Sequence, residues 1–360
     1  MLTFILKRLF NGVLVIFGVV TLVFLLFALL PADPARMVLG QRSDEQSLEM
    51  VRKDLGLDQP AWKQYVKYIN DLSPLSIHNT IDTDSFFYLD KDVYPSSTKI
   101  VNLSKEKTLI LKSPYLRRSF QSRERVGSIL MNALPNTFFL ALCSIIIGSI
   151  LGILFGVLSG IKPNSITDRV LVFVSTLGMS VPSFFAAILI GWLFAYILGP
   201  ITGLNITGNI TEIDDLTAES SLQLKNIILP AITLGIRPLA VVTQLTRNSL
   251  MQVMKQDFIR TARSKGLSEY KVVFRHALKN ALNPVVTSIS GWFASLMAGV
   301  VFVEYIFGWK GLGNVLVLSL NNLDVPVVSG CILIISIIFV LINIGVDIMY
   351  SILDPKVRLS

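Results

Sequence analysis

The chain has 360 residues, of which 52% are hydrophobic and only 16% are charged, and its mean hydropathy is +0.64. A water-soluble globular chain carries roughly a quarter charged residues, so this composition excludes an ordinary soluble fold. The formal net charge of +8 does not indicate a nucleic-acid-binding protein, because the basic residues stand between apolar runs instead of forming a patch with interleaved aromatic residues.

Six apolar segments are long enough to cross a membrane, since a helix needs roughly 20 residues to span about 30 Å of hydrocarbon. In chain order they are 9–30, 134–161, 170–198, 227–245, 284–303 and 325–346. Only the fourth contains a charge, Arg237. The first follows Lys7 and Arg8, yet its 22 uncharged residues exceed the roughly 7 to 15 of a cleavable signal peptide. The sequence therefore predicts an all-α membrane protein with six transmembrane helices, the first of which is retained.

The basic residues near the short loops predict the orientation, because Lys and Arg concentrate on the cytoplasmic side of a membrane. With a cytoplasmic N-terminus, that side carries Lys7, Arg8, Lys162, Arg169, eight basic residues between 247 and 279, Lys356 and Arg358. The two short loops on the opposite side carry only Lys225 and Lys310. We therefore predict that residues 1–30 form the first helix with a cytoplasmic N-terminus and that residues 354–360 are a cytoplasmic tail.

Residues 31–126 are predicted to form an external region between the first two helices. Ser43 and Gln46 make a capping-box pattern for a helix that ends near Gly56. A second helix is predicted from Pro60. One face of it carries Trp62, Tyr65 and Ile69. That face either packs on the protein or rests on the membrane interface.

The same region contains two β-prone stretches, 98–103 and 108–112, joined by Ser-Lys-Glu-Lys. Such an arrangement predicts an exposed hairpin. The region is thus expected to be an α(+β) insertion, and the role of residues 71–112 stays open.

The longest cytoplasmic connection, 247–283, contains two short helical stretches that meet at Gly266. Ala262 and Gly266 are four residues apart and are predicted to share a helix face that is flat enough for another protein to approach. Val272, Val273, Phe274 and Leu278 give the second stretch an apolar side. A short amphipathic helix of this kind docks into a groove on a partner, or the loop merely fixes the topology by its positive charge.

Three residues inside the apolar segments, Arg237, Pro182 and Pro238, are candidates for a functional role. A charge such as Arg237 near the middle of a span costs at least about 2.5 kcal/mol and should face protein or water. It either attracts a substrate carboxylate, or pairs inside the protein with Asp347 or a backbone carbonyl, or lies near the membrane interface because its helix starts later. Pro182 and Pro238 stand within apolar segments and are candidate kinks that allow movement.

Acidic residues and histidines are informative by their positions. No Asp or Glu falls inside the six segments, which argues against a transporter driven by protons or sodium. Glu304 and Asp324 flank the last two segments and are expected to be exposed loop acids or contacts for an external partner. His78 and His276 lie outside the segments, and no zinc, catalytic-triad or phosphate-binding motif is present. We therefore predict no catalytic residue, no metal site and no cofactor bound by this chain.

Segment 257–284 contains Arg-Thr-Ala-Arg-Ser-Lys-Gly-Leu and His-Ala-Leu-Lys-Asn-Ala-Leu-Asn-Pro and resembles the coupling loop of dipeptide and oligopeptide permeases, which are members of the ATP-binding-cassette (ABC) importers. In the general importer loop, Glu-Ala-Ala precedes the glycine. Here Arg260 and Thr261 replace the Glu and the first Ala, while Ala262 and Gly266 remain, as in the peptide branch. Further matches are residues 2–8, Leu-Pro-Ala-Asp-Pro at 30–34, Ser-Val-Pro-Ser-Phe at 180–184, Leu-Thr-Arg at 245–247, the run 304–313 and Leu-Asp-Pro at 353–355. Together they cover nearly everything except about 71–112.

The resemblance implies a type I ABC importer permease fold, in which residues 127–353 form the shared transmembrane domain with five helices and a coupling loop at about 250–283. It implies a bacterial inner-membrane complex of this chain, a second homologous permease subunit, two cytoplasmic ATP-binding subunits that use the ATP, and an external solute-binding protein. The chain would form the pathway for peptides or similar small solutes, with Arg237 and Pro182 as candidate pathway residues. The ATPase would be coupled through the 257–279 loop by Asp257, Arg260, Thr261, Ala262, Gly266 and Leu267. The alternative is an ion-coupled secondary transporter or a channel subunit.

Overall fold

A computed structural model describes residues 2–29, 35, 39, 44–54, 56–83, 85–213 and 220–353. The chain forms two compact units. The first, called here the helical unit, comprises residues 1–10, 133–317 and 335–360. The second, called the mixed unit, comprises residues 11–132 and 318–334.

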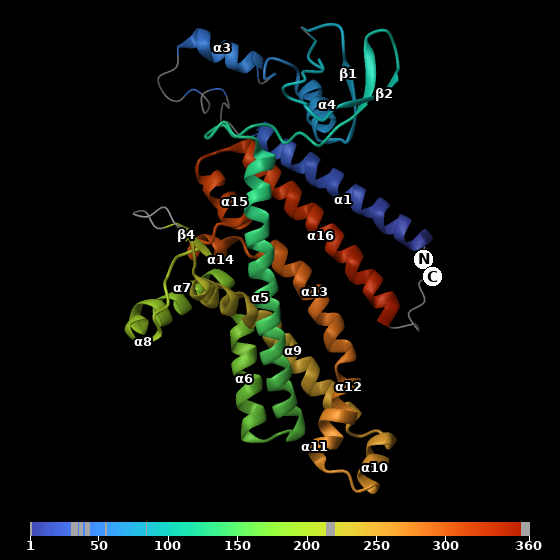
Figure 1. Cartoon of the computed structure of the whole chain (residues 1–360), viewed down its shortest axis with the longest axis vertical. Coiled ribbons are helices and arrows are strands. Elements are labelled where there is room, and N and C mark those ends of the chain that lie inside the picture. The colour runs from blue at the N-terminus through green and yellow to red at the C-terminus, as the bar shows by residue number, and fades with distance from the viewer. Residues whose placement is uncertain are drawn as a thin grey trace. The chain divides into compact units, whose positions relative to one another are not determined.

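Four helices within the described residues are long and apolar enough to cross a membrane (Figure 1). They are α1 (Leu2–Leu29), α5 (Val126–Ile161), α9 (Ile228–Val253, extended by the 3-10 turn η2, Leu224–Ile227) and α16 (Val325–Leu353). A fifth span exists if α6 (Ile166–Ser180) is counted together with α7 (Ser183–Ile190) and the π-helical η1 (Gly191–Ile197). The prediction of six spans is therefore met only in part.

The prediction of one continuous helix over the third apolar segment, residues 170–198, is wrong. Its two halves are bent by 111° at a break between Ser180 and Ser183. Pro182 stands at this break as the N-cap of α7, with Val181 in an extended conformation. Proline has no N–H to donate and disfavours a helical conformation in the residue before it, so the helix ends at this point. The predicted fifth segment is α13 (Asn283–Gly299), which has 17 residues and is followed by α14 (Val301–Ile306).

Helices α5 and α9 pack with almost no space between their backbones. Four glycines of α5 at a spacing of four residues face α9: Gly148, Gly152, Gly156 and Gly160. A Cβ atom at Gly148 would lie 2.6 Å from the backbone oxygen of Gly235, and one at Gly156 would lie 2.5 Å from Cβ of Thr246. Small residues permit this approach, which holds helices together where water provides no hydrophobic driving force. Helix α6 packs along α9 as well (Figure 1).

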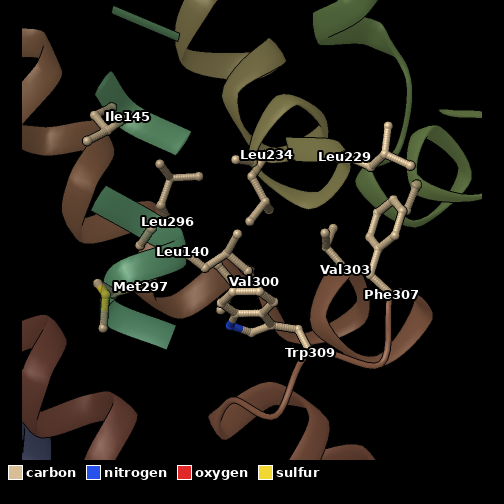
Figure 2. Close-up of a cluster of buried hydrophobic side chains, with 13 residues drawn as sticks. Leu140, Ile145, Leu229, Leu234, Leu296, Met297, Val300, Val303, Phe307 and Trp309 are labelled. Carbon is tan, nitrogen blue, oxygen red and sulfur yellow. The ribbon is translucent and has the colours of Figure 1, made fainter. Parts of the chain in front are cut away.

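The core of the helical unit gathers side chains from α5, α9, α13 and α14. Figure 2 shows Leu140, Leu229 and Leu234 together with Val300, Phe307 and Trp309 in this cluster. Trp309 is fully buried, and its indole N–H donates to the carbonyl of Asn136 at 3.0 Å. The next helix, α15, spans Leu312–Asn321. Other small elements of this unit are α8 (Gly199–Thr202) and the antiparallel strands β4 (Thr211–Ile213) and β5 (Ser220–Leu222).

The mixed unit contains two short helices and a small sheet. Helix α3 spans Glu45–Asp54 and α4 spans Ala61–Leu72, with Pro60 as its N-cap, so the helix predicted from Pro60 is confirmed. Ser43, the predicted cap of α3, lies outside the described residues. On α4, the Tyr65 ring lies 5.1 Å from that of Phe24 on α1, and its hydroxyl bonds with Thr21 at 2.6 Å. The face of α4 at Tyr65 therefore packs on α1, whereas Trp62 is exposed.

The sheet has the order β1-β3-β2, and both of its pairings are antiparallel. Strands β2 (Thr98–Asn102) and β3 (Lys107–Leu111) are the predicted hairpin, which is confirmed. Strand β1 (Leu75–Asn79) was not predicted from the sequence; it pairs with β3 in the register Leu75 to Leu111.

Candidate functional site

The connection from α9 to α13 folds into a compact helical loop. Helix α10 (Asp257–Ser264) is followed by a turn and then by one helical stretch made of α11 (Glu269–Lys271), the π-helical η3 (Val272–Ala277) and α12 (Leu278–Ala281). The turn is made at Gly266, whose φ of 74° lies in the left-handed region, and its N–H donates to the carbonyl of Arg263 at 2.9 Å. Glycine adopts this conformation without steric cost, which is why it commonly terminates helices.

The inner face of this loop packs against the end of α9. Its buried side chains are Ile259 and Ala262 from α10 and Val272, Val273, Ala277 and Ala281 from the second stretch; they pack with Leu250 and Val253. Leu267 is partly buried against the same cluster. The loop is therefore fixed on α9 by an apolar core of its own.

The predicted common face of Ala262 and Gly266 is wrong. Helix α10 ends at Ser264, before Gly266, and the left-handed turn at Gly266 changes the direction of the chain. Ala262 is only 7% exposed and faces the inner core, whereas a Cβ atom at Gly266 would meet no atom within 4 Å. The small side chain of Ala262 permits close packing within this chain, and Gly266 permits the turn.

The outer face of the loop carries the other predicted residues and three aromatic residues, of which Phe258 and Tyr270 were not singled out from the sequence. Asp257, Arg260 and Thr261 are exposed. Three exposed aromatic side chains are Phe258, Tyr270 and Phe274; the rings of the last two lie 4.6 Å apart. Phe274 was expected on the apolar side with Val272 and Val273, but only the two valines are buried. Tyr270 and Phe274 stand four residues apart, which is the signal that would have identified this pair.

An ion pair fixes the last part of α9 directly before this loop. The guanidinium of Arg247 donates to both carboxylate oxygens of Asp168, with Nε at 2.6 Å and Nη2 at 2.7 Å. Asp168 also accepts from the hydroxyl of Ser159 and from the backbone N–H of Asn164. Because Ser159 is on α5 and Asp168 is on α6, this bidentate pair connects three helices.

Arg237 lies in the middle of α9 and is exposed. Within the described part of the chain it has no hydrogen bond or ion pair. The alternative that it pairs with Asp347 is wrong, because Asp347 pairs with Arg8 at 3.0 Å. Pro182 begins α7, which packs on α9. Pro238 does not interrupt α9, which continues as one helix to Val253, so the only break among these candidate kinks is at Pro182.

The two acids expected in exposed loops are both buried. Glu304 is fully buried, and its Oε2 atom accepts from the N–H groups of Gly313 at 2.7 Å and Asn314 at 3.3 Å, at the start of α15. Asp324 is 3% exposed and accepts from the hydroxyl of Ser119 and the N–H of Phe120. Each acid satisfies backbone donors that have no other intrahelical or strand partner, so neither is an external contact.

These features define a class of protein: a polytopic membrane protein with a loop that packs on its own helix and exposes its outer face. Within the described residues, no group of three or more His, Cys, Asp or Glu residues is placed to hold a metal ion. The chain belongs to the binding-protein-dependent transport system inner membrane components, whose family model matches residues 152–359. The N-terminal model of such membrane components matches residues 1–83.

Relatives match along nearly their whole length. The dipeptide transport system permease protein of Alkalihalophilus pseudofirmus is 31% identical, covering 99% of this chain and 100% of the relative. The di/tripeptide transport system permease protein of Pseudomonas aeruginosa is 32% identical, with 99% of each covered. The glutathione transport system permease protein of Escherichia coli is 33% identical, again with 99% of each covered.

Among solved structures, inward-facing conformations of the MetNI methionine ABC transporter align with 16% identity and a TM-score of 0.49, covering 63% of this chain and 96% of that chain. The family assignment rests on the sequence matches. They confirm the resemblance to peptide permeases of the ABC importers. The chain is a multi-pass permease subunit, not an enzyme, and its family works with a separate ATPase and a solute-binding protein. These matches rule out the alternative of an ion-coupled secondary transporter or channel subunit, because the relatives are permease subunits of binding-protein-dependent transport systems.

Proposed function

We propose that this chain forms the translocation pathway for short peptides or similar small solutes that carry a free carboxylate. The relatives named for dipeptides, di/tripeptides and glutathione support this substrate class. The observation that carries the proposal is Arg237, an exposed charge without a partner among the described residues, in the middle of an apolar span. Such a charge is expensive in a membrane unless it faces water or a ligand.

The test compares a dipeptide that has a free carboxyl terminus with its C-terminal amide. Uptake is measured in proteoliposomes that contain the complete transporter and its binding protein, whose affinity for each peptide is determined separately. Arg237→Gln should lower uptake of the free dipeptide at least tenfold and uptake of the amide less than twofold. Lys225→Gln, an exposed cation before the same helix, is the matched control and should change neither. Unchanged uptake of the free dipeptide by Arg237→Gln would refute the carboxylate role.

We further propose that the outer face of the α10–α12 loop docks on a cytoplasmic ATP-binding subunit. The inner face is occupied by the chain's own core, so Asp257, Arg260 and the aromatic pair Tyr270 and Phe274 are what the loop offers to a partner. Exposed aromatic and Arg side chains are typical anchors of protein interfaces. In this role Ala262, Gly266 and Leu267 build the loop, and Thr261 is exposed beside Arg260.

The double variant Tyr270→Ala/Phe274→Ala tests this docking. We expect the permease to be inserted normally, to co-purify with at least fivefold less ATPase and to lose transport in proportion. Trp62→Ala removes an equally exposed aromatic residue from α4 and serves as the control. Normal co-purification by the double variant would show that the docking surface lies elsewhere.

The proposed assembly contains a second homologous permease subunit, two ATP-binding subunits that use the ATP and an external solute-binding protein in a bacterial inner membrane. This chain itself would bind no cofactor. Its two termini would be cytoplasmic, as the distribution of Lys and Arg predicts. Helices α13 and α14 would supply the remaining span of six, since both are uncharged up to Glu304 and α13 packs on α9.

A further inference from the structure

A cavity of about 290 Å³ lies within the mixed unit. Its walls come from the end of α1, one face of α4, the segment before α5 and the start of α16. Most of the lining is apolar and includes Phe24, Phe27, Leu72 and Phe120. Ala28 and Ala61 line the cavity and are themselves exposed, so they mark its opening.

Two of these walls are ends of membrane-spanning helices. The apolar span of α1 ends at Ala28, and that of α16 begins at Val325. The cavity therefore lies at the depth where a bilayer changes from hydrocarbon to headgroups. Next to the lining residues of α1, Leu25 and Leu26 are exposed and add apolar surface to this helix. A lipid chain is the apolar molecule that is present at this depth at high concentration.

One charged residue lines the cavity, and two further cations lie near the carboxylate that it approaches. Arg117 lines the cavity, lies over the ring of Tyr68 at 5.5 Å and has its Nε atom 3.9 Å from Oδ2 of the buried Asp71. Lys67 approaches the same carboxylate at 3.9 Å, and Lys112 donates to the backbone carbonyl of Asp71 at 2.5 Å. Two cations thus approach the carboxylate of Asp71 and a third donates to its backbone carbonyl, so the group of three cations and one carboxylate carries a net charge of +2.

Burial is the main influence on the pKa of both lysines. Burial, opposed by the attraction of Asp71, lowers the pKa of Lys67 and brings the pKa of Lys112 down to about 8. At neutral pH Lys112 therefore remains mostly protonated. A negatively charged group beside Arg117 would relieve the repulsion among these three cations.

The backbone fixes Arg117 at the cavity. Its φ of 66° lies in the left-handed region, which is uncommon for a residue other than glycine. The carbonyl of Arg117 accepts from the N–H of Val126, at the start of α5, at 3.1 Å. The side chain thus points from a defined turn, in a conformation that surrounding contacts maintain.

We propose that this cavity binds an acyl chain of an anionic phospholipid whose phosphate lies against Arg117. The chain would fill the apolar space between α1, α4 and α16, and the headgroup would lie at the opening. Lipid bound in this way holds the mixed unit together at the membrane surface. The site shares no residue with the proposed peptide pathway or with the ATPase-docking loop.

The acyl-chain part is tested by native mass spectrometry of the assembled transporter, washed in mild detergent and titrated with phosphatidylglycerol. Ala61→Phe fills the opening from α4, and Val66→Phe adds the same ring on the opposite, exposed side of that helix. The wild type and Val66→Phe should retain one tightly bound lipid, whereas Ala61→Phe should bind it at least tenfold more weakly. Ala28→Phe closes the opening from α1 and should reproduce this loss, with Leu26→Phe, on the other side of the same helix, as its control. Equal retention by both filling variants, with normal assembly, would overturn the proposal.

The headgroup part is tested by comparing phosphatidylglycerol with phosphatidylcholine, oleate and inorganic phosphate. The wild type should prefer phosphatidylglycerol to phosphatidylcholine about tenfold, and Arg117→Gln should abolish the preference. Arg118→Gln, the neighbouring cation outside the cavity lining, should leave it unchanged. A preference that persists in Arg117→Gln would overturn the assignment of the phosphate. Displacement of the lipid by inorganic phosphate alone, or by oleate with equal affinity, would show that the site is not one for a phospholipid.

Discussion

The contact between α5 and α9 predicts that alanine has opposite effects at two helical glycines. A Cβ atom at Gly156 would lie 2.5 Å from Cβ of Thr246 and 2.7 Å from the backbone oxygen of Thr243. At Gly345, within α16, a Cβ atom would meet nothing within 4 Å. Gly345→Ala should therefore stabilise the protein by about 0.5–1 kcal/mol through its better helix propensity.

Gly156→Ala gains the same propensity but must separate two helices. Neither obstructing atom belongs to the end of a flexible side chain, so relief requires movement of the backbone. Overpacking of this kind costs about 1–3 kcal/mol, which leaves Gly156→Ala destabilised by roughly 0–2.5 kcal/mol and below Gly345→Ala by about 1–3 kcal/mol. Gly160→Ala should lie between them, because its nearest neighbour, at 3.1 Å, is Cδ2 of the flexible Leu250 side chain.

The assay is reversible unfolding of the purified variants in mixed micelles, titrated with SDS and followed by circular dichroism. The order of stability should be Gly345→Ala, Gly160→Ala and then Gly156→Ala. Equal stability of Gly156→Ala and Gly345→Ala would show that α5 and α9 have room for a methyl group, contrary to the packing described above.

Two further predictions concern polar groups. Arg247→Ala should destabilise the protein by about 3–5 kcal/mol, because it leaves Asp168 buried without its ion pair. Asp168→Asn should cost less, because the Arg247 side chain that it leaves unpaired is 21% exposed. SDS titration of both variants checks this order. Burial lowers the pKa of His78 to about 4, so below its usual pKa of about 6.5 the unfolded state binds a proton that the folded state does not. Stability of the mixed unit should therefore fall by about 1–2 kcal/mol between pH 7 and pH 5, a loss that thermal unfolding should detect in the wild type but not in His78→Phe.

Hydrophobic length and turn chemistry were sufficient to predict much of the fold. Four apolar spans, the helix after Pro60 and the hairpin of β2 and β3 follow from local patterns that tertiary contacts did not override. The break at Pro182 was visible as a proline, but its angle depends on how α6 and α7 each pack on α9. Strand β1 is only five residues long, and its pairing with β3 comes from contacts distant in the sequence.

The candidate site was less predictable, because a spacing of four residues implies a common face only while the helix continues. At Gly266 the helix has already ended, so Ala262 and Gly266 have different surroundings. Glu304 and Asp324 illustrate a second limit. An acid next to an apolar span usually lies in an exposed loop, and only the folded chain brings the N–H groups of Gly313 and Phe120 to these two carboxylates.

The apolar core under the α10–α12 loop attaches that loop rigidly to the end of α9, so the loop is not a flexible connection. Arg237 and Val253 are 16 residues apart on this helix, which corresponds to about 24 Å. The glycine contacts pack α5 against the same stretch of α9, so we expect the two helices to move together as one rigid unit. If the loop is displaced sideways by about 3 Å, the rigid segment of α9 between Arg237 and Val253 tilts by roughly 7° about Arg237. Under the proposed function, a force applied to the loop would therefore rotate α9 at the charged residue near its middle.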